Sequence, residues 1–320
     1  MKCPLFLFSL PRSGSTLLQT VLSGHAHIAS TAEPWLLLPF IYTLKKNGQA
    51  SEYSHTSAFL AFKDFISKME GQKETYFHCL RDFSLSLYQY CCPNDETYFL
   101  DKTPRYYLIL PEILQLFPDA KFIFLFRNPI HIYSSTMQTW GFNRFKYLAK
   151  SHIDLTTGPG LLSRGYQLFH KKAYALNYED FVISPETHLR EISDYLNLPY
   201  DPNLLTRLNE NRLHGHMGDP ALNTGNIDTG SLEKWHATFN TPFRKKIIAS
   251  YIRQLGADTV AIQGYDQGEL LKSIELMPGK TSITCARDMV DYLLYRIIQT
   301  MNLNLWMAKR FRWIYGTVLS

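Results

Sequence analysis

The start of the chain constrains the fold most. Residues Leu5 to Phe8 form a short, continuously apolar run, which is typical of a strand buried on both faces of a sheet. Pro11 interrupts the run, and apolar residues then recur at helical spacing from Leu17 to Leu22. The chain is therefore expected to begin as a strand, a tight turn and a helix.

The turn has the composition of an anion-binding loop. Small side chains and Gly14 allow the backbone to approach a ligand closely, and the free N–H groups at a helix start attract negative charge. Arg12 adds a fixed positive charge, while hydroxyl donors come from Ser13, Ser15 and Thr16. These five residues predict a phosphate-binding loop, with an ordinary strand-to-helix turn as the alternative when they are considered alone.

Further strands and helices alternate along the chain. Strands are expected over 28–32, 98–100, 121–126 and from 173 onward, and helical segments over 36–97, 106–117, 130–140, 187–196 and 241–255. This alternation predicts an α/β fold in which helices flank a parallel sheet. Residues 141–170, which include Gly158, Pro159 and Gly160, are predicted to form an irregular, mobile connection with one helix, and 201–230 a long loop.

Polar residues follow the predicted strands, at the edge where an open parallel sheet binds its ligands. Glu33 follows the second strand and is interpreted as a general base, or else as an ordinary glutamate at a helix N-terminus. Lys102 follows the third strand. Arg127 follows the fourth, and Ser135 lies in the next helix, so both can donate to one phosphate. A surface ion pair for Arg127 and a serine bonded to its own helix for Ser135 are the alternatives.

The composition limits the function classes. The chain has 320 residues, 45% of them hydrophobic, and a net charge of +5, which suits an anionic small ligand and does not point to nucleic acid. Its five cysteines are unevenly spaced and form no paired C-x-x-C sets, so neither a disulfide framework nor a metal site is expected. A reducing, cytoplasmic compartment is the simpler interpretation.

One domain is expected over 1–270, in which residues 36–97 form a helical insertion that shapes an acceptor pocket. Residues 271–320 change character, and the stretch from Arg287 to Ile314 has amphipathic helical spacing with basic residues near its end. This C-terminal helical extension is expected to pack on the domain or to form a homodimer surface. Peripheral docking on a membrane surface is the alternative, and no stretch is long and apolar enough to predict a membrane span.

Two common nucleotide-binding motifs are missing from the sequence. The pattern G-x-x-x-x-G-K-[ST] does not occur, so the loop at Arg12 lacks the lysine of a kinase or ATPase, and no G-x-G-x-x-G follows the first strand. A P-loop-like nucleotide kinase and a non-catalytic nucleotide-binding scaffold are therefore kept only as alternative functions.

Five motifs together resemble the sulfotransferases that depend on 3′-phosphoadenosine 5′-phosphosulfate (PAPS). They are, in chain order, PRSGSTLL at 11–18, DKTP at 101–104, FPDAKFIFLFRNP at 117–129, NYEDF at 177–181 and GSLEKW at 230–235. Their order and spacing agree with that family over about residues 4–240. Many cytosolic small-molecule sulfotransferases have a lysine where this chain has Arg12, so the chain resembles the bacterial and tyrosylprotein-sulfotransferase-like branches more closely than those enzymes. The resemblance implies the P-loop-NTPase-like sulfotransferase fold.

The resemblance assigns cofactor-binding roles to the residues that match the family's motifs. It implies that Arg12 to Thr16 hold the 5′-phosphosulfate of PAPS, and that Arg127 and Ser135 hold its 3′-phosphate. Tyr178 matches the family's tyrosine near the adenine and the 3′-phosphate. Lys234, which precedes a tryptophan, is similar to a late lysine that contacts the cofactor.

The resemblance also implies the reaction. Glu33 matches the family's catalytic base, Lys102 matches the lysine that stabilises the transferring sulfuryl group, and Arg12 adds positive charge beside it. Transfer to a hydroxyl or amine is then an in-line displacement that releases adenosine 3′,5′-bisphosphate (3′,5′-ADP). Sulfate carries less charge than phosphate, so no metal is expected. The acceptor is expected to be a small molecule, a glycan, a lipid or a peptide.

Overall fold

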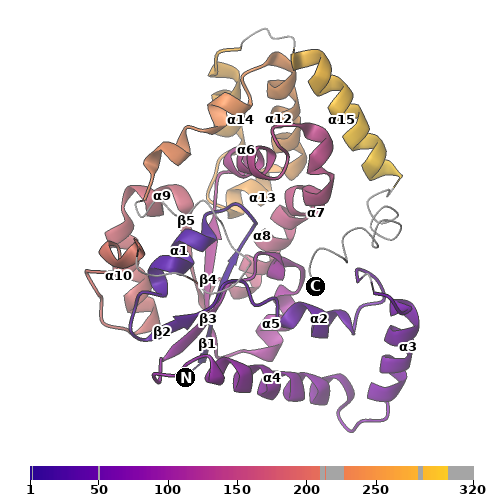
Figure 1. The fold of residues 1–320 in the computed structure, drawn as a ribbon, viewed down its shortest axis with the longest axis vertical. Coiled ribbons are helices and arrows are strands. Elements are labelled where there is room, and N and C mark those ends of the chain that lie inside the picture. The colour runs from indigo at the N-terminus through magenta and orange to yellow at the C-terminus, as the bar shows by residue number, and fades with distance from the viewer. Residues whose placement is uncertain (2, 50, 210–212, 214–226, 280–283, 302–320) are drawn as a thin grey trace. The chain divides into compact units, whose positions relative to one another are not determined.

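In the computed structural model of the chain, β1 (Cys3–Ser9) is the middle strand of a five-stranded sheet (Figure 1). Its neighbours are β3 (Tyr98–Asp101) and β4 (Lys121–Phe126), and the edges are β2 (Ile28–Ser30) and β5 (Ala173–Asn177), which gives the order β2-β3-β1-β4-β5. Each pair of neighbouring strands is parallel. The α/β class with a parallel sheet is therefore confirmed.

The structure describes residues 1–320 except 2, 50, 210–212, 214–226, 280–283 and 302–320. By its internal contacts the chain divides into two units. The first comprises residues 1–126 and 164–228, and the second comprises residues 127–163 and 229–320. The predicted division into 1–270 and 271–320 stays a prediction.

The core of the first unit is built on β1 and β4, whose apolar runs are buried on both faces. Phe6 and Phe8 point to the same face because side chains alternate along a strand, and their rings stack 5.9 Å apart. Phe122 is the partner of Phe6 in the neighbouring strand, and its ring meets Phe169 of α8 (Gly158–Phe169) edge-on at 4.6 Å. Burying each such ring contributes about 1.5–3 kcal/mol, so the sheet gives the loops at its ends a rigid base.

Helices complete the first unit. They are α1 (Ser15–Leu22), α2 (Leu37–Tyr42), α3 (His55–Ile66), α4 (Gln72–Tyr90), α5 (Leu110–Leu116), α9 (Tyr178–Ile183) and α10 (Pro185–Leu196), with 3-10 helices η1 (Pro104–Leu108) and η3 (Thr206–Asn209). The helical character predicted for 36–97 is confirmed by α2, α3 and α4. The role of that segment in shaping an acceptor pocket stays a prediction.

The second unit is helical in its described residues. It contains α6 (Pro129–Thr139), α7 (His152–Thr156), α11 (Trp235–Thr238), α12 (Pro242–Leu255), α13 (Ala257–Ile262), α14 (Gln267–Leu276) and α15 (Thr284–Thr300), with 3-10 helices η2 (Phe145–Ser151) and η5 (Thr229–Leu232). α6, α12 and α15 fall where helices were expected. No described helix has both the length and the apolar character that a bilayer crossing requires.

Two predicted segments differ from the structure. The single helix expected over 106–117 is instead η1 followed by α5, because Ile109 leaves the helical region with φ −139° and ψ 23° and Pro111 begins a new helix. Proline has no N–H to give, so it fits the first turn of a helix better than its interior. The stretch Gly158 to Gly160, expected to be mobile, instead begins α8, where a proline in the first turn is likewise compatible with helix.

Candidate active site

The turn between β1 and α1 adopts a left-handed backbone conformation at two positions. Arg12 has φ 67° and Gly14 has φ 85°, and the N–H of Ser13 donates to the carbonyl of Leu10 at 3.3 Å. A positive φ is easy for glycine but costs energy in a residue with a Cβ. Such strained residues gather at ligand sites, where the surrounding structure holds them in place, so this turn is a candidate for ligand binding.

Gly14 lies directly against the ring of Tyr178. A Cβ built on Gly14 would come within 2.2 Å of two ring carbons of Tyr178, a distance that real atoms do not adopt. Tyr178 begins α9 immediately after β5, and it is buried. The glycine is therefore required twice, by the backbone conformation and by this close approach, and the contact joins two motifs that are far apart in the sequence.

The hydroxyl of Ser13 is buried and makes no hydrogen bond with any described residue. A buried hydroxyl without a partner costs about 1–3 kcal/mol, and that cost is removed when a ligand supplies an acceptor. The half-buried Arg12 and the N-terminus of α1 lie on either side of Ser13 in the chain. These features fit an anionic group such as a phosphate or a phosphosulfate.

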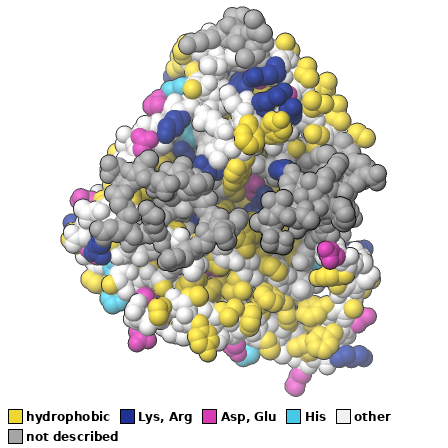
Figure 2. All heavy atoms as spheres, in the orientation of Figure 1, with side chains coloured by type: hydrophobic (Ala, Val, Ile, Leu, Met, Phe, Trp, Pro, Cys, Tyr) yellow, Lys and Arg dark blue, Asp and Glu magenta, His cyan; other side chains and the backbone are white. Residues whose placement is uncertain are grey.

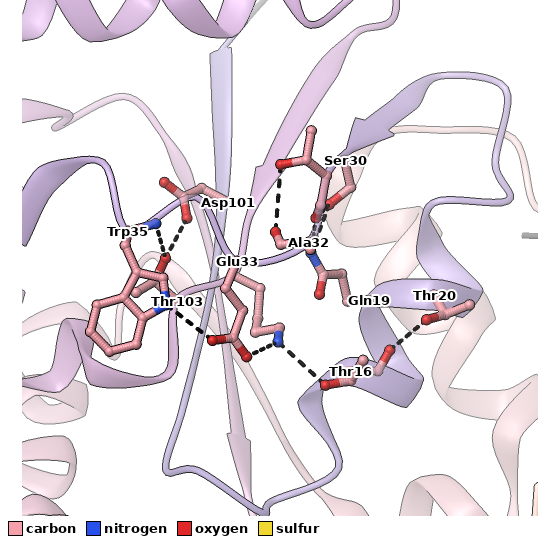
Figure 3. A network of polar contacts seen from close by, with 11 residues as sticks. Thr16, Gln19, Thr20, Ser30, Ala32, Glu33, Trp35, Asp101 and Thr103 are labelled. Carbon is pink, nitrogen blue, oxygen red and sulfur yellow. Dashed lines mark hydrogen bonds and ion pairs between the residues drawn. The ribbon is translucent and has the colours of Figure 1, made fainter. Parts of the chain in front are cut away.

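Lys102 follows β3 and links the segments that follow the two strands on either side of it, β2 and β1. Its Nζ donates to Glu33 Oε1 at 2.7 Å and to Thr16 Oγ1 at 3.3 Å. The lysine side chain is 1% exposed and that of Glu33 is 10% exposed, so this ion pair is almost fully removed from water. Figure 3 shows the Glu33 carboxylate between Trp35 and Thr16. Three residues that the sequence analysis selected therefore lie within one hydrogen-bonded group.

Trp35 holds the second oxygen of the Glu33 carboxylate. The indole Nε1 donates to Glu33 Oε2 at 3.1 Å, and the Trp35 N–H donates to Thr103 Oγ1 at 3.2 Å (Figure 3). Trp35 has φ 53°, so its own backbone is held in an uncommon conformation. Glu33 lies before α2, which begins at Leu37, so it is not a residue of that helix's first turn. The alternative of an ordinary N-terminal glutamate is wrong.

Gln19 of α1 anchors the segment that leads to Glu33. Its Nε2 donates to Ser30 Oγ at 2.9 Å and to the carbonyl of Thr31 at 2.7 Å, and its side chain is fully buried. Ser30 Oγ in turn donates to the carbonyl of Leu100 at 2.8 Å. These bonds fix the end of β2 against both α1 and β3, and so they fix the position from which Glu33 projects. Sequence reasoning missed this role for Gln19.

Asp101, the last residue of β3, is a buried carboxylate directly beside Lys102. It accepts hydrogen bonds from Tyr88 at 2.6 Å, Tyr106 at 2.9 Å and Thr103 at 3.1 Å. Burial raises the pKa of Asp101 from 3.8 to about 6, although these hydrogen bonds and the charge of Lys102 act in the opposite direction. The network fixes the backbone from which Lys102 projects. The motif DKTP contained this aspartate, but no short-range signal pointed to its two tyrosine partners.

In the second unit, Arg127 precedes α6 and Ser135 lies within it. Arg127 is buried and immediately precedes Asn128, whose side chain accepts from the N–H of Ile130 at 2.9 Å and so caps the helix. Pro129 occupies the first turn, where its missing N–H has no effect. Ser135 is half-buried on the same helix. The helix expected from 130 to 140 is therefore confirmed with its start one residue earlier.

Polar contacts connect α6 to the segment that carries Lys234. Ser134 Oγ lies 2.7 Å from Thr238 Oγ1, and Gln138 Nε2 donates to the same Thr238 hydroxyl at 2.6 Å. The rings of His131 and Trp235 stack 6.0 Å apart. α6 and α11 thus pack together, with the exposed Lys234 at the start of α11.

The predicted site residues divide between the two units. The first unit holds the loop from Arg12 to Thr16 with Glu33, Lys102 and Tyr178, and the contacts above gather them. Arg127, Ser135 and Lys234 belong to the second unit. Of the loop at 218–233, whose cofactor contacts the resemblance does not assign, residues 218–226 lie outside the described residues.

Residues 4–202 match the model of the family described as "Sulfotransferase family". This match covers more than half of the chain. The chain belongs to the sulfotransferase family. The resemblance predicted from the five motifs is therefore confirmed, and the match includes the loop at Arg12, the Glu33 and Lys102 pair, Arg127 and Tyr178.

Two relatives show how far the similarity extends. The nodulation protein NoeE of Sinorhizobium fredii is 27% identical over 290 residues, which cover 82% of this chain and 66% of NoeE. A Caenorhabditis briggsae protein whose name places it among the protein-tyrosine sulfotransferases is 22% identical over 277 residues, covering 80% of this chain and 89% of its own. The chain thus spans just under two thirds of NoeE.

A solved structure confirms the fold. The sulfotransferase domain from the Synechococcus PCC 7002 olefin synthase superposes with a TM-score of 0.55 at 24% sequence identity, and the match covers 83% of this chain and 97% of that domain. The parallel sheet with its flanking helices is thus the P-loop-like sulfotransferase fold, as the motifs predicted.

Proposed function

We propose that this sulfotransferase-family protein moves a sulfuryl group from PAPS to a hydroxyl or amine of an acceptor, with Glu33 as the general base. The observation that carries the proposal is the position of the Lys102 ammonium, which lies within hydrogen-bond distance of both Glu33 and the Thr16 hydroxyl of the loop. The Lys102 side chain is thus a cation that contacts both the proposed base and the proposed anion-binding turn.

The turn from Arg12 to Thr16 is the proposed site of the 5′-phosphosulfate. The buried, unbonded hydroxyl of Ser13 and the backbone of Gly14, pressed against Tyr178, form a surface that fits an anionic group. We assign Arg127, Ser135 and Lys234 to the 3′-phosphate and the nearby cofactor atoms, and Tyr178 to the adenine side. These assignments rest on the motifs, and Arg127 supplies the planar guanidinium that suits a phosphate.

The proposed mechanism depends on how Glu33 is held. Bound PAPS supplies an activated sulfuryl group and leaves as adenosine 3′,5′-bisphosphate. Glu33 takes the proton of the attacking acceptor oxygen or nitrogen, while Trp35 keeps the carboxylate in one orientation through Oε2. Lys102 and Arg12 stabilise the negative charge that develops near Thr16.

Lys102 has two roles in this mechanism. In the described structure it is closer to Glu33 than to Thr16, at 2.7 and 3.3 Å. An anionic group that enters beside Thr16 competes with Glu33 for the ammonium, because a cation divides its attraction between nearby negative charges. Weakening the ion pair frees Oε1 of Glu33 to accept a proton, so donor binding and activation of the base are coupled.

The comparisons suggest one acceptor class to test, and the kinase alternative has no observation in its favour. The name of the Caenorhabditis briggsae relative makes a peptide tyrosine one class to test. Glycan, lipid and small-molecule hydroxyls complete the panel. A P-loop-like kinase or a non-catalytic scaffold finds no support from the loop, which has no Walker lysine.

The test is transfer of radiolabel from [35S]PAPS to a panel of these acceptors, with wild type and Glu33→Gln compared. We expect label transfer by the wild type, and a loss of about 10²–10⁴-fold in the variant, because general-base catalysis contributes that much. Binding of adenosine 3′,5′-bisphosphate should be kept in the variant. Transfer by Glu33→Gln at the wild-type rate would remove Glu33 as the base.

A further inference from the structure

The last described helix, α15, is unlike an ordinary surface helix, because its acidic residues face inward and its apolar residues face outward. Asp288 and Asp291 of α15 are 0% and 1% exposed and point into the second unit. Asp288 accepts from Arg244 Nε at 2.6 Å, and Asp291 accepts from Arg144 Nε at 2.7 Å. Tyr295, one turn further, is buried in the same row. Ion pairs therefore fix the inward face of α15.

The outward face of α15 is apolar. Its exposed residues are Met289, Val290, Leu293, Leu294 and Ile297, with exposures between 41% and 61%, followed by Met301 at 65%. Residues four apart lie above one another on a helix, so these side chains form one stripe about 18 Å long. Figure 2 shows hydrophobic side chains gathered along the edge that α15 occupies in Figure 1. We call this stripe the outer face of α15.

The packing of the second unit does not need the outer face. α15 lies against η2 and α12 through its inner row, and both buried aspartates have their arginine partners there. A contiguous exposed apolar stripe of this kind is typical of a surface that meets another apolar phase or partner.

Aromatic and basic side chains also lie next to α15, around the arginine that pairs with Asp291. Arg144, which pairs with Asp291, also lies with its guanidinium 5.9 Å from the Tyr147 ring, and the Lys146 ammonium is 4.9 Å from the same ring. Phe142, which is 74% exposed, packs edge-on against Tyr147 at 5.8 Å. Aromatic rings beside lysine and arginine are typical of the interface between a bilayer and water.

The exposed charges of α15 are all positive. Its two acidic residues are buried, which leaves Arg287 and Arg296 as its exposed charged side chains. The sequence that follows, 302–320, contains Trp306, Lys309 and Arg310 among its aromatic and basic residues and has no aspartate or glutamate. A second copy of the chain would bring like charges together at this face, whereas an anionic lipid surface would complement them.

We propose that the outer face of α15, together with Phe142 and Tyr147, docks on an anionic membrane surface. The helix lies in the plane of the interface with its apolar stripe toward the acyl chains, and Arg287 and Arg296 meet lipid headgroups. The ion pairs to Arg144 and Arg244 keep the helix attached to the protein while its apolar side faces the bilayer.

The experiment measures sedimentation of the full chain with phosphatidylcholine vesicles, with and without phosphatidylserine. The double variant Leu293→Glu/Ile297→Glu places two negative charges on the outer face. The matched control is Ile183→Glu/Leu276→Glu, which adds the same charge at apolar residues that are 65% and 75% exposed elsewhere. Thermal melts establish that both variants stay folded, since all four positions are exposed.

We expect the wild type and the control to sediment with phosphatidylserine vesicles, and the outer-face variant to lose at least about tenfold of that binding. Binding of the wild type should fall with added salt and be weak on phosphatidylcholine alone. The proposal is overturned if the wild type does not bind, if it does not distinguish the two vesicle types, or if the outer-face variant binds as well as the control. A wild-type dimer that this variant dissociates, without vesicle binding, would show that a second copy covers the face.

Discussion

Lys102 places one ammonium between Glu33 and Thr16 in an environment almost closed to water. Burying two charges is costly, and the pair is tolerated because each charge has a partner and further hydrogen bonds. Removing one partner therefore leaves the other charge buried and uncompensated. Because each buried charge depends on the other, variants of Lys102 and Glu33 can separate the role of Lys102 in stability from its role in catalysis.

We predict that Lys102→Met lowers the free energy of unfolding by about 3–5 kcal/mol, because Glu33 loses its counter-charge. Adding Glu33→Gln should restore part of that loss, since no buried carboxylate then remains. Sulfuryl transfer should be lost in Lys102→Met and in the double variant, so the double variant regains stability without regaining activity. Urea denaturation of the two single variants and the double variant measures the coupling, and strictly additive losses would show that the ion pair does not exist in solution.

Asp101 predicts a pH dependence of stability. Burial raises its pKa from 3.8 to about 6, so the folded protein binds the proton more tightly than the unfolded chain. The stability that this proton gives is complete below pH 3.8 and is lost as the pH rises through about 6. We therefore predict that wild type loses roughly 2 kcal/mol relative to Asp101→Asn between about pH 4 and 7.

The measurement is urea denaturation of wild type and Asp101→Asn across that pH range. The comparison cancels the other titrating groups, which the two proteins share. If the two curves of unfolding free energy against pH run parallel, then Asp101 does not titrate as its burial requires.

Single residues show which parts of the site could be predicted from the sequence. Glu33 and Lys102 could be placed together from the sequence because both follow parallel strands, whose carboxyl ends share one edge. Their contact at 2.7 Å is consistent with that reasoning. Tyr88 could not be connected with Asp101, since the contact depends on how α4 packs against the sheet. Trp35 stood beside Glu33 in the sequence, but its role depends on a φ of 53° that no pattern predicts.

At the scale of elements, the loop between β1 and α1 leaves little room for substitution at Gly14. Gly14 is held at φ 85°, and a Cβ there would overlap the Tyr178 ring at 2.2 Å. Both requirements come from structure, whereas the sequence indicated only that a glycine allows close approach to a ligand. The contact that restricts Gly14 is with another part of the protein.

We predict that Gly14→Ala destabilises the protein by about 1–3 kcal/mol and weakens binding of adenosine 3′,5′-bisphosphate, because the loop must move away from Tyr178. The loss in Gly14→Ala/Tyr178→Ala should be smaller than the sum of the two single losses, since the overlap is removed while the backbone strain remains. Thermal melts and calorimetry test both effects. Equal stability of Gly14→Ala and wild type would contradict the described loop geometry.

Elements with a clear local sequence pattern were predicted well, and elements that depend on packing against other helices were not. The apolar run at 121–126 became β4 with the same bounds because a buried parallel strand has a simple signature. α13 and α14 were not predicted. α13 has six residues and α14 ten, and both pack on α12. Short helices gain most of their stability from such contacts, which are invisible in a local pattern.

At the scale of the whole molecule, the family and the fold are established, while the donor and the acceptor are proposals. The motif set could identify the family because five separate patterns had to occur in the correct order. It could not identify an acceptor, since acceptor pockets are shaped by packed side chains and carry no short code. The sequence predicted an amphipathic helix at α15 but not which of its sides is exposed, because that depends on the burial of Asp288 and Asp291.

The proposal that PAPS is the donor is tested most directly by calorimetric titration with adenosine 3′,5′-bisphosphate and with adenosine 5′-diphosphate, which lacks the 3′-phosphate. We predict that wild type binds the bisphosphate about 10–100-fold more tightly, because a charge-assisted hydrogen bond contributes about 1.5–3 kcal/mol. Arg127→Ala should lose that preference while it keeps the weaker affinity for adenosine 5′-diphosphate. A wild type that fails to bind the bisphosphate, or that binds both nucleotides equally, would contradict the proposed function.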